Sequence, residues 1–546
     1  MRHESSLGAR IRDVAWIAIP FVVYLALLRL LWFDAPDRDD YEAILEGTMR
    51  LLDAPSLGEW VQALLRQHNE HRIVVTRLVA LAMAELTGRI NFRILMLLAS
   101  LGLAAIIFQL WVEFRDRAAA PLVAAAGFLL CQMSYYEGAL LSMAAFSNTG
   151  VLVFALACFQ FAVRPGRWSL ALAVGFGLVA GYTQANGLLA LPLAAVACAL
   201  RRERWRAGLL AVAGLVLWSF YLASYEHPPH HASPLEALRH PLTVVQLFVV
   251  IVGSVAPGVW AATAFGAALL AALAWLALGG FWRQRPAIAL WIVFILLSAA
   301  ATAAGRVSWG VFWASRYAIN SSCLMAVVFL LVATRRDWHR RQAIAAFATA
   351  AAVSLGISWV VWPYATAYAF RGRMLVKAVP DSPGMVPDPY FGFVFPTHGA
   401  GPVLARAEAR NLYRVREVAV FAAELRASAG PPRPQRRGGA LDKVEVVGTR
   451  VVASGWTDLA ATMPGRVFTA YSPEIAASSS LALVPRNDIA TLTGASVQVF
   501  SGFRWEGRYG SEAQAARAAS TLCLLVEAPG YGPTALAGND ACGPAP

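Results

Sequence analysis

The sequence predicts an α-helical polytopic membrane protein, with about 11 transmembrane helices, followed by a mostly-β C-terminal domain. Three observations predict this fold class. Of the 546 residues, 58% are hydrophobic and only 14% are charged. Apolar runs repeatedly reach the roughly 20 residues that a helix needs to cross a hydrocarbon core about 30 Å thick. Beyond residue 441, short segments alternate apolar and polar residues between turn signals, as half-buried strands do.

The first apolar run, 14–33, is predicted to be a retained membrane anchor. It follows a short basic start, but it is too long for a signal peptide and no small-residue cleavage site follows it. Ten later runs have the length and apolar character of spans. The expected spans are 14–33, 92–113, 119–135, 145–164, 168–183, 186–200, 206–223, 260–280, 287–304, 317–334 and 342–362.

The basic residues indicate how these spans are oriented. With a cytoplasmic N-terminus, the loops EFRDR, VRPGR, RRERWR, FWRQRP and TRRDWHRR all face the cytoplasm, where Lys and Arg accumulate in membrane proteins. Arginines in these cytoplasmic loops therefore account for the net charge of +13, and we expect no nucleic-acid partner. A crossing by the run 244–259 would place FWRQRP outside, so we expect that run to be re-entrant or to lie on the periplasmic surface.

An odd number of crossings places the region after residue 363 in the periplasm of a bacterial inner membrane protein. We expect a transmembrane domain over 1–363 with a periplasmic first loop at 34–91, and an irregular and helical segment over 364–428, with a helix at 402–428. A flexible linker is expected over 429–440 and a small β-sandwich over 441–546.

The cysteines fit this organisation. Four of the six lie in or beside apolar runs, where a cysteine is usually a small hydrophobic residue. Cys523 and Cys542 are the two in the polar C-terminal region, and they are close enough in sequence to form a local disulfide. Such a pair implies an oxidising compartment, in agreement with the periplasm.

Unusual polar residues gather on the predicted periplasmic side. The first loop opens with LWFDAPDRDDYE, which contains Asp39, Asp40 and Tyr41, and continues to RQHNEHR, which contains Glu70. Each stretch has a structural alternative, because Asp and Asn also begin helices. The two histidines of HNEHR lack the i, i+4 spacing of an HExxH zinc site, which disfavours zinc. Further candidates that line a substrate site are His68, His71, Glu137, Gln184, Asn186, His230 and Tyr317.

Three arginines are candidates for binding an anion. Arg306 and Arg316 flank a Trp-rich loop on the periplasmic side, against the usual charge bias, and Arg72 lies in the first loop. The alternative is that arginines at span ends only extend to the membrane surface. A guanidinium pairs two phosphate oxygens at once, which makes these residues candidates for a phosphate site.

One span, a long acidic outer loop with surface helices, many further spans and a periplasmic C-terminal domain together resemble the GT-C superfamily of membrane glycosyltransferases. A looser likeness to uncharacterised bacterial proteins of this type lies in HNEHR with Arg77, TQANGLL and SRY. The resemblance implies a catalytic carboxylate in the first outer loop, which by position is Asp39 or Asp40, with Glu70 as the reserve. The segments SGWTD and SGFRW are similar to accessory carbohydrate-binding modules.

The chemistry makes compatible demands. The periplasm lacks nucleotide sugars, so a sugar donor there is normally a polyprenyl phosphate, and an attacking acceptor hydroxyl needs a general base. We therefore expect transfer from such a donor to a periplasmic or lipid-linked glycan. The sequence establishes no cofactor, and Mg²⁺ or Mn²⁺ shared by Asp39, Asp40 and the phosphate stays open. Two other functions stay open: a polysaccharide polymerase or ligase that uses a diphosphate-linked glycan, and a flippase, which the nearly charge-free spans disfavour.

Overall fold

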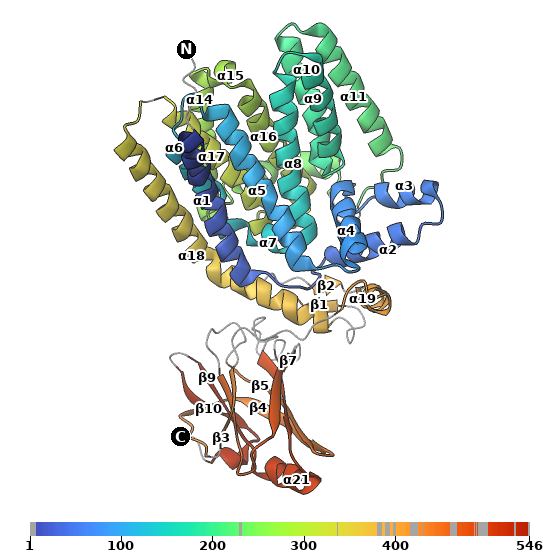
Figure 1. Ribbon diagram of the computed structural model, residues 1–546, viewed down its shortest axis with the longest axis vertical. Coiled ribbons are helices and arrows are strands. Elements are labelled where there is room, and N and C mark those ends of the chain that lie inside the picture. The colour runs from blue at the N-terminus through green and yellow to red at the C-terminus, as the bar shows by residue number, and fades with distance from the viewer. Residues whose placement is uncertain are drawn as a thin grey trace. The chain divides into compact units, whose positions relative to one another are not determined.

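The computed structural model divides the chain into two compact units (Figure 1). The helical unit comprises residues 1–365 and 410–413, and the C-terminal unit comprises 366–409 and 414–546. The structure describes residues 7–228, 232–335, 337–378, 385–387, 394–396, 400–414, 424–428, 430–458, 467–484, 486, 489, 501–528 and 531–543.

Within these ranges, eight helices are long and apolar enough to cross a membrane. The predicted fold class is thereby confirmed in its coarse form, as a helical membrane protein with a C-terminal β domain. The eight are α1 (Leu7–Leu31), α5 (Phe92–Phe114), α8 (Ser142–Ala162), α11 (Arg204–Leu222), α14 (Val259–Leu278), α16 (Pro286–Gly305), α17 (Ala318–Ala333) and α18 (Arg340–Ala378).

The remaining apolar runs form shorter helices than the sequence predicts. The expected span 119–135 contains α6 (Ala120–Leu130), after which the chain turns through η2 (Met133–Tyr135) and α7 (Tyr136–Leu140). At 1.5 Å per residue, the 11 residues of α6 cover only about half of a hydrocarbon core. The other short apolar helices are α9 (Arg167–Gly181), α10 (Ala190–Leu200), which follows η3 (Ala185–Leu189), and α13 (Pro241–Val252).

The helix α8 lies at the centre of the helical unit, in contact with α5, α9, α10 and α16. Most of its apolar residues are buried, as expected for a helix largely surrounded by other helices. The buried indole of Trp291 on α16 donates a hydrogen bond to the carbonyl of Leu152 on α8 at 3.0 Å. This central packing fixes the first turn of α8, which borders the site described below.

The segment 34–91, which the sequence predicts to be the first outer loop, is largely helical. It contains η1 (Tyr41–Glu46), α2 (Gly47–Leu52), α3 (Leu57–Leu65) and α4 (Val74–Thr87). Ser56 caps α3 by accepting a hydrogen bond from the amide of Glu59. At the other end of α3, Arg77 donates to three carbonyl oxygens that the helix leaves unpaired, which include that of Leu64 at 2.9 Å. The loop is therefore an ordered structure that holds the segment 66–72 in place.

The C-terminal unit contains one curled eight-stranded sheet, in the order β3-β6-β9-β10-β4-β5-β8-β7, rather than the two packed sheets of the predicted sandwich. Its edge strands β3 and β7 approach each other, and α21 (Glu512–Thr521) packs on β4 and β5. The strands are β3 (Glu424–Ser428), β4 (Arg436–Val447), β5 (Arg450–Trp456), β6 (Val467–Tyr471), β7 (Ser478–Val484), β8 (Gly502–Arg508), β9 (Cys523–Ala528) and β10 (Tyr531–Ala537).

Other expectations for the C-terminal region need correction. The predicted linker 429–440 is partly strand, because β4 begins at Arg436 and pairs with both β5 and β10. In the described part of the predicted helix 402–428, residues 402–414 and 424–428, α19 (Ala400–Ala409) ends at Ala409 and the strand β3 occupies the last five residues. A two-stranded sheet, β1 (Met385–Pro387) and β2 (Val394–Pro396), precedes α19. Cys523 and Cys542 are disulfide-bonded, the pairing expected from the sequence.

Candidate active site in the helical unit

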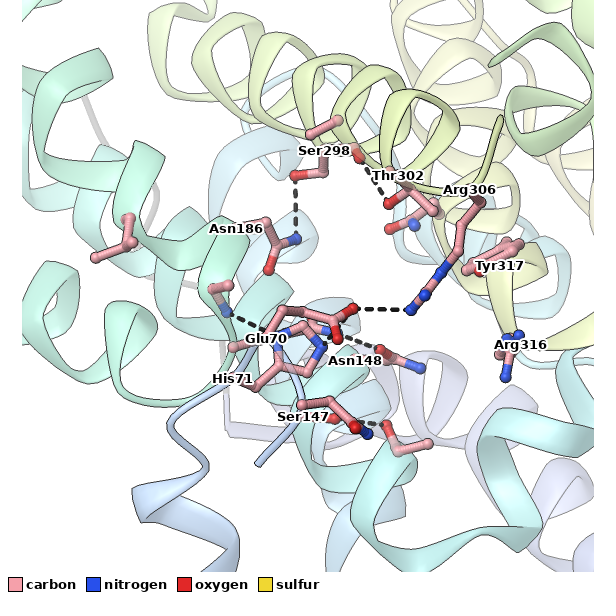
Figure 2. Close-up of a pocket in the computed structure, with 18 of the residues that line it drawn as sticks. Glu70, His71, Ser147, Asn148, Asn186, Ser298, Thr302, Arg306, Arg316 and Tyr317 are labelled. Atoms are coloured by element: carbon pink, nitrogen blue, oxygen red, sulfur yellow. Dashed lines mark hydrogen bonds and ion pairs between the residues drawn. The ribbon is translucent and has the colours of Figure 1, made fainter. Parts of the chain in front are cut away.

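A cavity of about 390 Å³ lies within the helical unit, where segments far apart in the sequence meet (Figure 2). The first outer loop, the N-terminal turns of α8, the turn η3, the C-terminal end of α16 and the start of α17 all contribute to its wall. The sequence-predicted site residues that line it are Asp39, Glu70, His71, Gln184, Asn186, Arg306, Arg316 and Tyr317.

An ion pair joins two of these residues. Nη2 of Arg306 lies 2.9 Å from Oε1 of Glu70, and both side chains are largely buried, with exposed fractions of 14% and 20% (Figure 2). The guanidinium also lies 4.8 Å from the ring centroid of Trp309. The other terminal nitrogen, Nη1, is buried and has no hydrogen-bond partner among the described residues. Arg306 thus keeps one donor nitrogen for a further ligand.

His71 extends this pair toward η3. Its Nδ1 accepts a hydrogen bond from the backbone amide of Ala185 at 3.3 Å, and its Nε2 lies 3.6 Å from Oε1 of Glu70. Burial lowers the pKa of His71 below its ordinary value, against the opposing effect of the Glu70 carboxylate. The imidazole is therefore neutral near pH 7, with its proton on Nε2 and directed toward Glu70.

Amide side chains also line the cavity. Gln184 donates to Oδ1 of Asn148 at 2.7 Å, and Asn186 donates to Oγ of Ser298 at 3.0 Å (Figure 2). The side-chain oxygen Oδ1 of Asn186 is buried and has no hydrogen-bond partner in the described part of the chain. A buried amide oxygen without a donor is costly in a folded protein, so this atom is positioned to accept a hydrogen bond from a ligand.

Arg316 is a second cation in the cavity wall. Its guanidinium lies 5.3 Å from the ring centroid of Tyr317, which also lines the cavity. Among the described residues, no carboxylate lies within ion-pair distance of this side chain, although Glu137 is near enough to act on it electrostatically. A guanidinium that has no carboxylate at ion-pair distance among the described residues attracts an anionic ligand.

The neighbouring aspartates Asp39 and Asp40 have different environments. The Asp39 side chain is 41% exposed, lines the cavity and lies 3.9 Å from Nε2 of His68. Asp40 is fully buried and does not line the cavity. Its two carboxylate oxygens accept hydrogen bonds from the backbone amides of Met143, at 2.8 Å, and Ser142, at 3.3 Å, in the first turn of α8. Burial raises the pKa of Asp40 well above its ordinary value, although the amide of Met143 opposes this shift.

Arg72 is occupied by structural contacts. Its guanidinium donates to the carbonyl oxygens of Leu65 and Tyr221 and to Oγ of Ser224, at 2.9 Å for Ser224. These bonds connect the end of α3 to the end of α11. The side chain is buried and does not line the cavity, so the expected role in phosphate binding is not supported by its position.

Other predicted site residues also lie outside the cavity. Glu137 is buried and accepts a hydrogen bond from Arg38 at 2.9 Å. His68 is buried, with Nδ1 3.6 Å from the carboxylate of Glu42, and Tyr41 is buried in η1. These three are positioned to support the first outer loop rather than to touch a ligand. His230 lies outside the described residues.

The described residues contain no group of three or more His, Cys, Asp or Glu side chains that could hold a metal ion. Asp40, half of the predicted Mg²⁺ or Mn²⁺ site, accepts hydrogen bonds from the α8 backbone with both oxygens. The metal site at Asp39 and Asp40 stays a prediction.

The sequence reasoning missed small polar residues on the spans themselves. Ser147 and Asn148 on α8, Thr302 on α16 and Asn320 on α17 all line the cavity. The sequence signal for them was short polar side chains in otherwise apolar helices, near the N-terminal ends of α8 and α17 and the C-terminal end of α16. Such residues are common in membrane helices, where they also bond to the carbonyl one turn earlier, as Thr302 does.

The structure brings two carboxylates, two guanidiniums, one neutral imidazole and several amides into one cavity. These groups can bind an anion and accept a proton. The resemblance to GT-C enzymes stays a prediction. No protein-family model matches this chain, and no curated protein or solved structure matches it either.

Proposed function

We propose that this protein is an integral-membrane glycosyltransferase that moves a sugar from a polyprenyl-phosphate donor to a glycan acceptor at the periplasmic face of a bacterial inner membrane. The observation that carries the proposal is the convergence of Asp39, Glu70, Arg306 and Arg316 on one cavity. A base and two cations are the groups that this transfer requires. The GT-C-like fold, the cytoplasmic N-terminus and the periplasmic C-terminal domain belong to the same proposal.

The donor phosphate is assigned to the two arginines. Arg316 has no carboxylate within ion-pair distance among the described residues, and Arg306 keeps Nη1 available. Guanidinium groups bind phosphate oxygens through charge-assisted hydrogen bonds. The cavity wall also contains Leu188, Leu189 and Trp218, an apolar surface suited to the first isoprene units of the carrier.

Asp39 is the proposed general base. It lines the cavity and is partly exposed, so an acceptor hydroxyl can reach it. In the transfer, the hydroxyl oxygen forms a bond to the anomeric carbon as the bond from that carbon to the phosphate oxygen breaks. The hydroxyl proton passes to the Asp39 carboxylate, and polyprenyl phosphate leaves with the bonding electrons, its charge balanced by the two arginines.

Glu70 is the proposed organiser of the site. Its ion pair with Arg306 directs that guanidinium, and the neutral His71 lies on its other side. The Glu70 carboxylate is engaged by Arg306 and is only 20% exposed, whereas Asp39 is 41% exposed, which favours Asp39 as the base because an acceptor hydroxyl can reach it. Glu70 is therefore a positioning residue in this scheme.

The proposal is tested by incubating the purified protein with a panel of radiolabelled polyprenyl-phosphate sugars and membrane extract, and then following the label. Transfer from one donor, lost in Asp39→Asn and retained in the control Glu85→Ala on the exposed side of α4, is the expected result. A matched panel of diphosphate-linked glycans tests the polymerase or ligase alternative. Movement of intact lipid between leaflets, with no transfer from any donor, would replace the proposal with a flippase.

A further inference from the structure

A second hollow opens in the helical unit next to the cavity. This groove, of about 1160 Å³, runs between α2, α3, the segment 66–72 and the segment 224–228. Asn69 lines both the groove and the cavity, so this residue lies between the two spaces. The groove is therefore a neighbour of the cavity that Asp39 lines.

Hydrogen bonds connect the segments that form the wall of the groove. Gln67 donates to the carbonyl oxygens of Asn69 and Glu226, both at 2.6 Å, and accepts from the amide of Glu226 at 2.9 Å. Arg72 donates to the carbonyl oxygen of Leu65 and Arg77 to that of Leu64, at the end of α3. Preformed walls lower the ordering cost of binding a flexible ligand.

The residues that face the groove are mainly polar and of mixed charge. Glu42, Asp53, Glu59 and Glu226 are exposed carboxylates on its wall, and Arg50 and Arg66 are exposed guanidiniums. A polyanion would require an excess of cations, and an apolar peptide would require apolar pockets. Interspersed carboxylates, amides and guanidiniums instead match a neutral, hydroxyl-rich ligand, whose hydroxyls both donate and accept hydrogen bonds.

We infer that this groove binds the acceptor, and that the acceptor is a neutral glycan chain whose terminal hydroxyl passes Asn69 into the cavity. The inference rests on the proposed transferase function and names its acceptor class. Asn69 is suited to the junction, because its backbone is in the left-handed region, at φ 49°, and its side chain is exposed there. Asn tolerates that conformation better than most other residues.

Two variants separate the groove from the cavity. Gln62 and Arg66 are exposed on the groove wall, and neither side chain forms a hydrogen bond or ion pair with another described residue. The double variant Gln62→Ala/Arg66→Ala therefore removes ligand contacts without breaking a known internal contact. Glu85→Ala/Arg89→Ala is the matched control, because it removes two exposed polar side chains from α4 and its C-terminal turn, away from the groove.

The experiment applies the full-length protein in detergent to an array of neutral bacterial oligosaccharides of increasing length, alongside peptides and anionic polysaccharides. We expect binding to neutral oligosaccharides that strengthens with length, falls about tenfold in Gln62→Ala/Arg66→Ala, and is unchanged in the control. Equal binding by both double variants, preferential binding of peptides or polyanions, or no binding to any oligosaccharide would overturn the inference.

Asp39→Asn distinguishes failure of this inference from failure of the proposed function. That variant should bind the same oligosaccharides as the wild type while losing transfer. Oligosaccharide binding that depends on the groove, without turnover of any donor, would reject the transferase and leave the groove as a glycan site. Sugar transfer whose acceptor KM is unchanged in Gln62→Ala/Arg66→Ala would reject the groove alone.

Discussion

Glu70 and Arg306 are 236 positions apart in the chain, yet their side chains form an ion pair of 2.9 Å in the wall of the cavity. One comes from the first outer loop and the other from the end of α16. Each is largely withdrawn from water, so the pair is only weakly screened by salt. The contact therefore fixes where the second terminal nitrogen of Arg306 lies, and with it the proposed phosphate position.

Replacing Arg306 should impair donor binding. In Arg306→Lys the charge is kept, but the planar fork that binds Glu70 and a phosphate together is lost. We expect the KM for the donor to rise roughly tenfold, with a smaller effect on kcat. Steady-state kinetics at several donor concentrations provide the measurement. Arg239→Lys, an exposed residue of α12 (Pro234–Arg239) outside the cavity wall, is the control, and an unchanged donor KM in Arg306→Lys would reject the phosphate assignment.

The two aspartates should respond differently to the same substitution. Asp39→Asn removes the proposed base, so transfer should fall by roughly 10²–10⁴ with normal membrane yield. In Asp40→Asn one oxygen is replaced by an NH₂ group, which places a donor against a backbone amide of α8 and should cost about 1–3 kcal/mol of stability. Transfer rates and thermal unfolding are measured for both variants. The opposite pattern, with Asp40→Asn stable and inactive, would identify Asp40 as the base.

The lowered pKa of His71 predicts a loss of stability on the acid side. Burial holds the folded-state pKa below about 6.5, so the unfolded chain takes up the proton first as the pH falls. Stability should be constant above about pH 7 and should decline as the pH falls from about 6.5 through the lowered pKa of the folded state.

The groups that face this imidazole are Glu70, His68, Arg306 and Asp39. The Nδ1 contact with Ala185 would also be lost on protonation, because Nδ1 could no longer accept. Melting temperatures are compared between wild type and His71→Gln across this pH range. The variant should show a flatter dependence, and identical slopes for the two proteins would exclude His71 as the source.

Membrane topology provides a separate prediction. Reporter fusions after Arg115, Arg204 and Arg283 should report the cytoplasm, because these arginines lie in the basic loops between spans. Fusions after Gly88 and Gly430 should report the periplasm. A cytoplasmic signal at Gly88 would place the cavity on the side where nucleotide sugars are available, and the polyprenyl-phosphate donor would lose its rationale.

The sequence by itself determined the class of the protein and most of its helices. Apolar runs of span length predict α5, α8 and α16 because a helix must bury its backbone polar groups in lipid, a requirement of composition rather than of neighbours. Charge in the outer loops likewise marked Glu70 and Arg306 as candidates. Both signals are local, which is why they can be found without the fold.

Only the tertiary structure decided which candidates share a site. Asp39 and Asp40 are adjacent and chemically identical, and they differ because the amides of Ser142 and Met143 lie opposite one and not the other. Arg72 is two positions from Glu70, but its guanidinium donates its hydrogen bonds to the carbonyl oxygens of Leu65 and Tyr221. The role of a polar residue depends on the partners that packing brings to it, and those partners lie up to hundreds of positions away, where no local pattern can specify them.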